Sequence, residues 1–374
     1  MKNIVNLGNV ATYINGYAFK PSDWAEDGTP IIRIQDLTGN SYQMNRFKGI
    51  VDSKYDVNSG DVLISWSASL GVYVWNRGNA VLNQHIFKVV FDKEEVDKDF
   101  FVFQIDNLLK RAANQAHGAT MRHLTKPVFD ALPFYLPDIK TQRLISSKLN
   151  LIVHLIEDHH EQLKKLDELI RSRFIEMFGD LINEPKYPGI KLGSLGVMIT
   201  GGTPSRKHDE YYGGNIPFIS TPCLGSNFIS EKNVQNYLTE AGVKNSATHK
   251  IPPYSLMVGN RVGVGKSSIN TCEMCTNQDI LSFVDIDTSR FDLLFLKKVI
   301  DQYSPYFEEH KRGATIQGVP SKVIKDSMVP DVPLEMQKRY TALVKQSDKS
   351  KLAVQKSLDE LEILRKSLMQ TYFG

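Results

Sequence analysis

Two long stretches of the chain carry apolar residues at the spacing of a helical stripe. From Ile145 the apolar positions recur at alternating steps of four and three, interrupted by His159 and Arg173, which is the pattern of a heptad seam. The first seam consists of Ile145, Leu149, Ile152, Ile156, Leu163, Leu166 and Ile170. A looser second seam consists of Val354, Leu358, Leu361, Leu364 and Leu368. Neither stretch has an internal Gly or Pro, so the sequence predicts long helices at 141–179 and 334–374.

Each predicted helix needs a partner for its apolar stripe. A helix of about 35 residues is roughly 50 Å long and cannot bury such a stripe by itself. We expect each helix to pack on the other, and an antiparallel pair would place the segments that precede them at opposite ends. An alternative is that both helices belong to the core of one larger domain. His159, on the seam, is expected to form a polar layer that sets the register and not a ligand site.

The remaining segments, 1–140 and 180–333, have the pattern of mixed α/β domains. Short apolar runs such as 86–90 (IFKVV) alternate with Gly and Asn turns, which is typical of strands joined by loops. Each segment also contains one amphipathic stretch, at 99–112 and 291–303, that predicts a helix.

The chain repeats itself. Short motifs of the first half return in the same order in the second half: Leu7-Gly8 as Leu192-Gly193, Gly16 as Gly201, Pro30-Ile31-Ile32 as Pro217-Phe218-Ile219, Asn83-Gln84 as Asn277-Gln278, and Gly118-Ala119-Thr120 as Gly313-Ala314-Thr315. Each half then has a Gln, a long helical pattern and a Phe-Gly ending. An ordered series of this kind indicates a duplicated unit. The predicted fold class is α+β, with two tandem α/β domains separated by two long antiparallel coiled-coil helices in a pseudo-twofold internal repeat.

Composition narrows the class of protein but does not identify a partner. Hydrophobic residues make up 41% and charged residues 23% of the 374 residues, which is typical of a soluble globular protein. The net charge of +3 is compatible with nucleic-acid binding without arguing for it. We expect a cytoplasmic protein, because the N-terminus has no apolar signal region and three cysteines cannot form a disulfide framework.

Two motifs of the second half, together with the repeat, resemble a known family. Residues 201–220 (GGTPSRKHDEYYGGNIPFIS) and 313–340 (GATIQGVPSKVIKDSMVPDVPLEMQKRY) are similar to the opening and closing elements of the specificity subunit of type I restriction–modification systems. Residues 15–19 (NGYAF) stand where the first half would carry the Gly-Gly-Thr-Pro element, so that half matches more weakly. The resemblance extends over essentially the whole chain through the order of its repeated parts.

This resemblance implies a DNA-reading subunit with no catalytic centre. Target-recognition domains at 1–140 and 180–333 would each read one half of an asymmetric bipartite DNA site. The helices at 141–179 and 334–374 would set the unread spacer and dock two methyltransferase (modification) subunits, and with them the restriction (motor and nuclease) subunits. No cofactor is expected on this chain, whereas S-adenosylmethionine, ATP and Mg²⁺ are expected on the partner subunits.

Polar and basic residues in the predicted loops are the candidate DNA contacts. They are Ser67, Ser69, Arg77, Arg122, Arg261, Lys266, Arg312 and Gln317. Arginine and lysine contact phosphates or guanine, and sequence readers should differ between the two copies, as Arg122 and Gln317 do. The Asn-Gln pairs at 83–84 and 277–278 are shared by both copies, which favours a role in the fold.

Three motifs suggest other chemistry, but each departs from the pattern that this chemistry requires. Residues 260–268 (NRVGVGKSS) resemble the end of a phosphate-binding loop but lack its first glycine. Residues 251–254 (IPPY) resemble a methyltransferase tetrapeptide, yet Ile251 cannot accept the hydrogen bond of the target amine. Cys272 and Cys275 form a lone CxxC pair, so no metal site is predicted. The alternatives that remain are a nucleotide-binding enzyme or methyltransferase in its own right, and a coiled-coil scaffold without DNA function.

Overall fold

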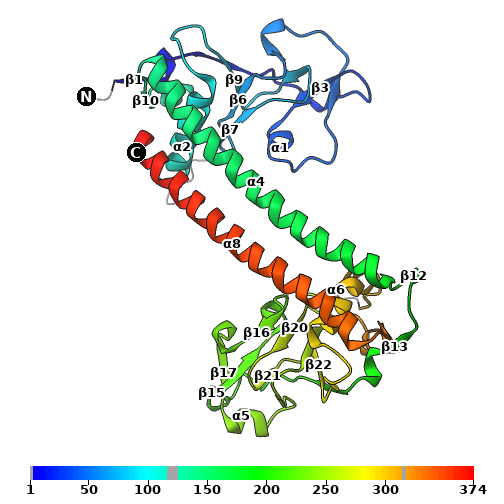
Figure 1. Cartoon of the computed structure of the whole chain (residues 1–374). Helices are drawn as coiled ribbons and strands as arrows, with labels where there is room; N and C mark the ends of the chain where they lie inside the picture. Colours follow the sequence, from blue (N-terminus) through cyan, green and yellow to red (C-terminus); the bar gives the residue numbers. More distant parts are fainter. Residues whose placement is uncertain (1–2, 116–124, 314–316) are drawn as a thin grey trace. The chain divides into compact units, whose positions relative to one another are not determined.

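A computed structural model describes residues 3–115, 125–313 and 317–374 (Figure 1). Contacts divide the chain into two compact units, one formed by Met1–His160 with Lys356–Gly374 and the other by Glu161–Gln355. Both units contain part of the long helices α4 (Ile139–Phe178) and α8 (Leu334–Phe373). In the described parts of the chain, no helix combines the length and apolar character needed to cross a membrane.

The first unit is built from small sheets packed against a helix. Its elements are β1 (Ile4–Asn6), β2 (Thr12–Asn15), β3 (Thr29–Ile32), α1 (Ile34–Leu37), β4 (Arg46–Phe47), β5 (Asp56–Val57), β6 (Val62–Ser65), β7 (Gly71–Val74), β8 (Ala80–Leu82), β9 (Ile86–Val90), α2 (Lys98–Gln115), α3 (Lys126–Asp130) and β10 (Pro133–Tyr135). Two four-stranded sheets have the orders β2-β9-β6-β7 and β4-β3-β8-β5, and β1 pairs with β10. The main core joins α2 to the first of these sheets, the start of α4 and the end of α8.

Strand β6 illustrates why this unit needs apolar residues on both faces of a strand. Successive side chains of a strand point to opposite faces. Val62 and Ile64 therefore join the core around α2, whereas Leu63 joins a second core with Trp75. The continuous apolar run is what a strand buried on both faces requires.

The second unit repeats this plan with additions. Its elements are β11 (Gly179–Asp180), β12 (Glu184–Pro185), β13 (Gly189–Lys191), β14 (Val197–Thr200), β15 (Tyr212–Ile219), β16 (Phe228–Ile229), β17 (Asn236–Leu238), α5 (Glu240–Lys244), β18 (Lys250–Ile251), β19 (Leu256–Gly259), β20 (Ser267–Asn270), β21 (Met274–Thr276), β22 (Ile280–Val284), α6 (Leu293–Glu309), α7 (Ser321–Lys325) and β23 (Met328–Pro330). The orders β14-β22-β19-β20 and β17-β15-β21-β18 match the two sheets of the first unit, and β16 extends the first of them. The predicted α+β fold with an internal repeat is confirmed.

The repeated motifs occupy the same places in both units. Ile31 pairs in parallel with Val81, and Phe218 pairs in parallel with Cys275. A Cβ atom on Gly16 would lie 2.0 Å from the backbone oxygen of Asn83, and one on Gly201 would lie 2.1 Å from that of Asn277. Only glycine allows so close an approach. The repeated Gly and Asn therefore belong to one backbone junction.

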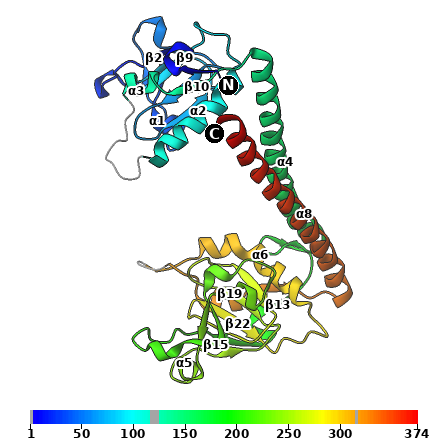
Figure 2. The ribbon, with the colours of Figure 1, turned by 90° about the vertical axis from the view of Figure 1, so that its left-hand side faces the viewer.

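The predicted pairing of the long helices is confirmed within each unit, where α4 and α8 lie side by side in both views (Figures 1 and 2). In the first unit, His159 Nε2 lies 3.0 Å from Ser357 Oγ, so His159 forms the expected polar layer. In the second unit, Tyr340 Oη donates to the Ile170 oxygen (3.3 Å). Contacts of low-numbered residues in one helix with high-numbered residues in the other make the pair antiparallel.

Burial along the helices agrees with most of the predicted seam. Buried positions are Ile145, Leu149, Ile152, Ile156, Ile170 and Leu358. Partly buried positions are Leu163, Leu166, Val354, Leu361 and Leu368. Leu364 was placed on the seam wrongly, because its side chain is 46% exposed. After the step of three from Leu358 to Leu361, the helix needs a step of four, which brings the partly buried Arg365 to the inner face.

Candidate nucleic-acid interface

The best-defined candidate residue is Arg261, in the loop between β19 and β20. Its Nη1 atom lies 3.5 Å from Oδ1 of Asp279. The Arg261 side chain is 49% exposed, whereas that of Asp279 is only 14% exposed. Asp279 is held in turn by Asn277, whose Nδ2 donates to Oδ2 of Asp279 (3.2 Å). The exposed guanidinium of Arg261 thus lies beside two partly buried polar groups, Asp279 and Asn277.

Backbone hydrogen bonds bring a second segment against this loop. The amide of Asn260 donates to the Asp279 oxygen (3.0 Å), and the amide of Val319 donates to the Asn260 oxygen (2.7 Å). Arg312 and Gly318 exchange two backbone hydrogen bonds, which holds both residues beside the loop. Two candidates that are far apart in sequence, Arg261 and Arg312, therefore come close together.

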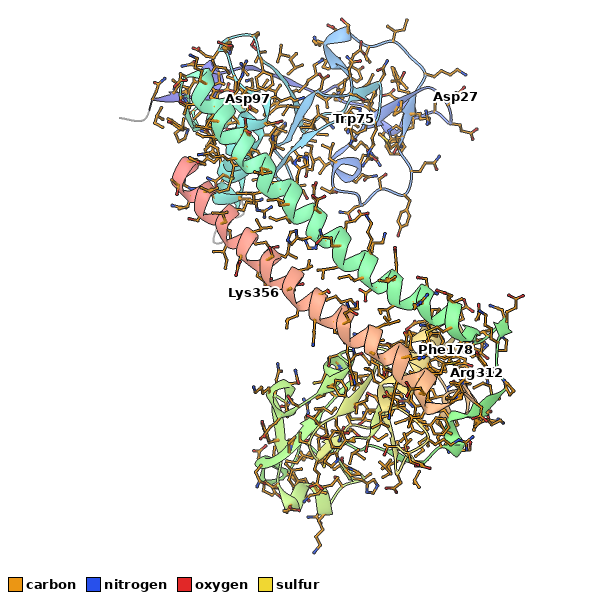
Figure 3. All side chains as sticks on the ribbon, in the orientation of Figure 1. Asp27, Trp75, Asp97, Phe178, Arg312 and Lys356 are labelled. Atoms are coloured by element: carbon orange, nitrogen blue, oxygen red, sulfur yellow. The ribbon has the colours of Figure 1, made fainter. Side chains whose placement is uncertain are left out.

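Both arginines line one groove of about 650 Å³ on the second unit. Its other polar lining residues are Thr200, Asn260, Gln278 and Ser321. Arg312, labelled in Figure 3, is exposed, as is Gln317, which directly precedes Gly318. Hydrogen-bonding side chains around two arginines suit a polyanion or the edges of bases.

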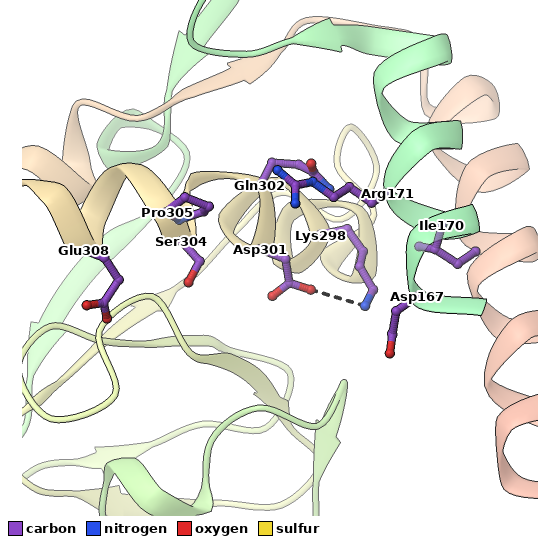
Figure 4. Close-up of a pocket in the computed structure, with 9 residues that line it drawn as sticks. All are labelled: Asp167, Ile170, Arg171, Lys298, Asp301, Gln302, Ser304, Pro305 and Glu308. Atoms are coloured by element: carbon purple, nitrogen blue, oxygen red, sulfur yellow. Dashed lines mark hydrogen bonds and ion pairs between the residues drawn. The ribbon is translucent and has the colours of Figure 1, made fainter. Parts of the chain in front are cut away.

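Lys266 lies apart from this groove. It is exposed at the start of β20 and lines a different hollow of about 440 Å³ with Lys297 and Lys298. The carboxylate of Asp301 forms ion pairs with both lysines. Its Oδ2 atom lies 2.8 Å from Nζ of Lys297 and 3.2 Å from Nζ of Lys298. Burial lowers the pKa of Lys297. In an adjoining pocket, α6 contributes Lys298 and Asp301 and α4 contributes Asp167 (Figure 4).

The candidates of the first unit are not gathered in one place. Ser67 is buried and Ser69 is exposed, and both lie in the loop before β7. Arg77 lies in the turn after β7, with its guanidinium 5.6 Å from the ring centre of Trp75 (labelled in Figure 3). Because the two segments flank β7, they lie at opposite ends of that strand. Arg122 falls outside the described residues.

The matching loops of the two units differ in the residues they present. The amide of Trp66 donates to the His85 oxygen (3.3 Å), as the amide of Asn260 does to the Asp279 oxygen. Trp66 stacks on Phe87, with ring centres 5.6 Å apart. The first unit thus has an aromatic residue where the second has Asn260, followed by Arg261. Sequence reasoning did not include Asp279 among the candidate residues, although its difference from His85 was a usable signal.

The three motifs that suggested other chemistry lie in structural settings that do not match that chemistry. Lys266 is followed by strand β20, whereas a phosphate-binding loop is followed by a helix. Tyr254 has a φ of +62° in the turn before β19, at the position where the first copy has Gly60 (φ +99°). Cys275 is buried, and burial raises the pKa of its thiol to about 11. Within the described ranges, no three His, Cys, Asp or Glu residues gather as a metal site.

Comparison with known proteins identifies the family. Residues 2–168 and 187–362 match the type I restriction modification DNA specificity domain. The chain belongs to this family. Because the two matches fall on the two halves of the repeat, each half corresponds to one copy of the specificity domain.

The individual relatives share low sequence identity with this chain. The chain is 25% identical over 170 residues to the type I restriction enzyme EcoBI specificity subunit of Escherichia coli, which covers 45% of this chain and 35% of that protein. It is 26% identical over 155 residues to the MjaIX specificity subunit of Methanocaldococcus jannaschii, covering 41% and 36%. The matched segments therefore span about a third of the length of these relatives.

Two solved structures share the fold. A chain from a study of complex assembly and conformational transition in the type I R-M system superposes with a TM-score of 0.65 at 16% identity, covering 99% of this chain and 97% of that one. The type I restriction-modification S subunit from M. genitalium superposes with a TM-score of 0.57 at 13% identity, covering 100% and 96%. The fold of these two chains is thus shared over nearly the full length of the chain.

Proposed function

We propose that this chain is the DNA sequence-specificity subunit of a type I restriction–modification complex. Residues 1–140 and 180–333 would be the two target-recognition domains, and 141–179 and 334–374 the spacer helices. The observation that carries the proposal is that both copies keep the same backbone junctions while their β6–β7 and β19–β20 loops differ. Shared junctions preserve the fold, and different loops suit an asymmetric site in which each domain reads its own half.

Catalysis would then belong to the partners. The subunit would select the DNA site, and methyltransferase and restriction subunits would supply methyl transfer and cleavage. S-adenosylmethionine, ATP and Mg²⁺ would bind to those subunits. We expect two methyltransferase subunits, one for each copy of the repeat.

Apolar side chains on the helices support a docking role for them. Leu151 is 61% exposed on α4, and Leu352 is 74% exposed on α8. In the second unit, a pocket of about 240 Å³ opens between the two helices and includes Leu166, Leu169 and Leu343. Single exposed apolar residues are common on protein surfaces, so the stronger support is this pocket, where apolar groups of both helices gather.

The test is to purify the chain with a type I methyltransferase subunit from the same organism and to map adenine methylation on DNA treated with the complex. The proposal expects a two-part asymmetric motif with a fixed gap. Methylation without sequence preference would favour the scaffold alternative, and failure to form any complex would reject the proposal. Measurable binding of ATP or S-adenosylmethionine to the isolated chain would favour the enzyme alternative.

A further inference from the structure

Arg261 and Arg312 share a groove but differ in electrostatic setting. Arg261 is paired with Asp279, so the two side chains together carry almost no net charge. Arg312 forms no ion pair with the described residues, so no paired carboxylate offsets its charge. A phosphate is attracted by net charge, and a neighbouring carboxylate weakens that attraction. Arg261 is therefore poorly suited to a phosphate, whereas Arg312 is well suited to one.

The 3.5 Å contact with Asp279 gives the guanidinium of Arg261 a preferred orientation. One edge of its guanidinium faces Asp279, and Asp279 is itself bound by Asn277. The stem is held as well, because a Cβ atom on Gly318 would lie 2.7 Å from Cγ of Arg261. A guanidinium has five N–H donors in a rigid fork, so the donors that do not face Asp279 remain available to a second group.

We propose that Arg261, oriented by Asp279, reads a guanine in the half-site bound by the second unit. Guanine presents two adjacent acceptors, O6 and N7, in the major groove, and a fixed guanidinium fork can bind both. This assignment rests on the proposed function and adds the base that the groove recognises. Asp279 acts as a positioning residue, and Arg312 contacts the DNA backbone.

The first unit lacks this arrangement. His85 occupies the position of Asp279, and the loop there begins with Trp66 and the buried Ser67. Among the described residues, the equivalent loop of the first unit therefore offers no Arg–Asp pair for reading guanine. This difference provides one physical reason for the two half-sites to differ.

The experiment uses the full chain assembled with its methyltransferase subunits. Methylation rates are measured on a duplex library in which each position of the motif is varied in turn. The key variant is Arg261→Lys, which keeps the charge but loses the fork. Asp279→Asn tests the positioning role, and Arg290→Lys, at an exposed arginine that pairs with Asp331 outside the groove, is the matched control. Thermal unfolding is recorded for every variant.

Arg261→Lys should lower the preference for one G·C pair in one half-site by about 10- to 100-fold, with the other half-site and the gap unchanged. Asp279→Asn should relax the same position to a smaller extent, which a merely structural role would not do. Arg290→Lys should leave every position unchanged, whereas Arg312→Ala should weaken binding to all sequences alike and reduce its salt dependence.

Several results would overturn the assignment. An unchanged motif with Arg261→Lys would reject it while leaving the specificity-subunit proposal intact. Relaxation spread over both half-sites, or a half-site of the second unit without any G·C pair, would reject it as well. If the unaltered complex yields no two-part motif, the proposed function fails first and the guanine assignment fails with it.

Discussion

Gln142 and Gln337 show how a single repeated residue joins two elements. Oε1 of Gln337 accepts from the Asp292 amide (2.9 Å), and its Nε2 donates to the oxygens of Arg290 and Val332 (both 3.0 Å). Gln142 makes the matching bond to the Asp97 amide (2.9 Å) in the first unit. Each glutamine ties the start of a long helix to the start of α2 or α6.

Gln337→Ala should destabilise the second unit by about 2 kcal/mol, because buried backbone groups would lose their partners. Urea unfolding followed by circular dichroism would measure the change. Gln346→Ala, at an exposed position of the same helix, is the control and should stay within about 0.5 kcal/mol. Equal effects of the two substitutions would contradict the role assigned to Gln337.

The three thiols should differ in reactivity. Cys275 is buried with a raised pKa of about 11, whereas Cys223 and Cys272 are partly exposed. The thiolate is the reactive form, so Cys275 should be alkylated last by iodoacetamide at pH 8 in the native protein. In urea all three should react at similar rates. Rapid native labelling of Cys275, read by peptide mass spectrometry, would refute this.

The same thiol makes stability depend on pH. In the unfolded chain it ionises near its ordinary pKa of 9.0, and in the folded chain only near 11. Its contribution to stability is complete below pH 9 and is lost as pH rises through 11, because ionisation then favours the unfolded state.

Among the elements, α4 presents two faces with different tasks. Leu149 is fully buried in the core of the first unit, whereas Leu151 is 61% exposed. Leu149→Ala should lower stability by about 3 kcal/mol through loss of packing. Leu151→Ala should change stability by less than about 0.5 kcal/mol and should weaken co-purification of the methyltransferase. If Leu151→Ala leaves that association unchanged, this face of α4 is not the docking surface.

For the whole molecule, the helix pair is the proposed ruler of the spacer. Deleting 161–167 from α4 and 350–356 from α8 removes one heptad from each of the two helices. The deletion includes both partners of the Asp167–Lys351 ion pair. Seven residues correspond to about 10 Å of helix. The methylation motif should keep both half-sites and acquire a shorter gap. An unchanged gap would reject the ruler.

Much of this architecture could be predicted from the sequence because its signals lie along the chain. The heptad spacing of α4, the repeated Gly16 and Gly201 junctions, and apolar runs such as β6 reflect local periodicity or duplication. Such patterns need no knowledge of distant contacts. The prediction failed on the weaker seam of α8, where the inner position belongs to Arg365 and not to the preceding residue Leu364.

The candidate site could be predicted only in part. Composition and the differences between copies pointed to loop residues such as Arg261 and Arg312. Their meeting in one groove and the separation of Lys266 from it depend on how the β19–β20 loop packs against Arg312 and Gly318. The burial of Ser67 depends on packing within the first unit. The Arg261–Asp279 pair joins residues from different strand ends, and no periodic pattern records such a contact.

The sequence by itself determined the repeat, the mixed α/β units and the long helices, because spacing and duplication are properties of the chain. Only the tertiary structure decided which loop residues share a surface and which arginine is neutralised by a carboxylate. Electrostatic pairing and hydrogen-bond orientation depend on distances of a few ångströms between segments far apart in sequence, and these distances exist only in the folded molecule.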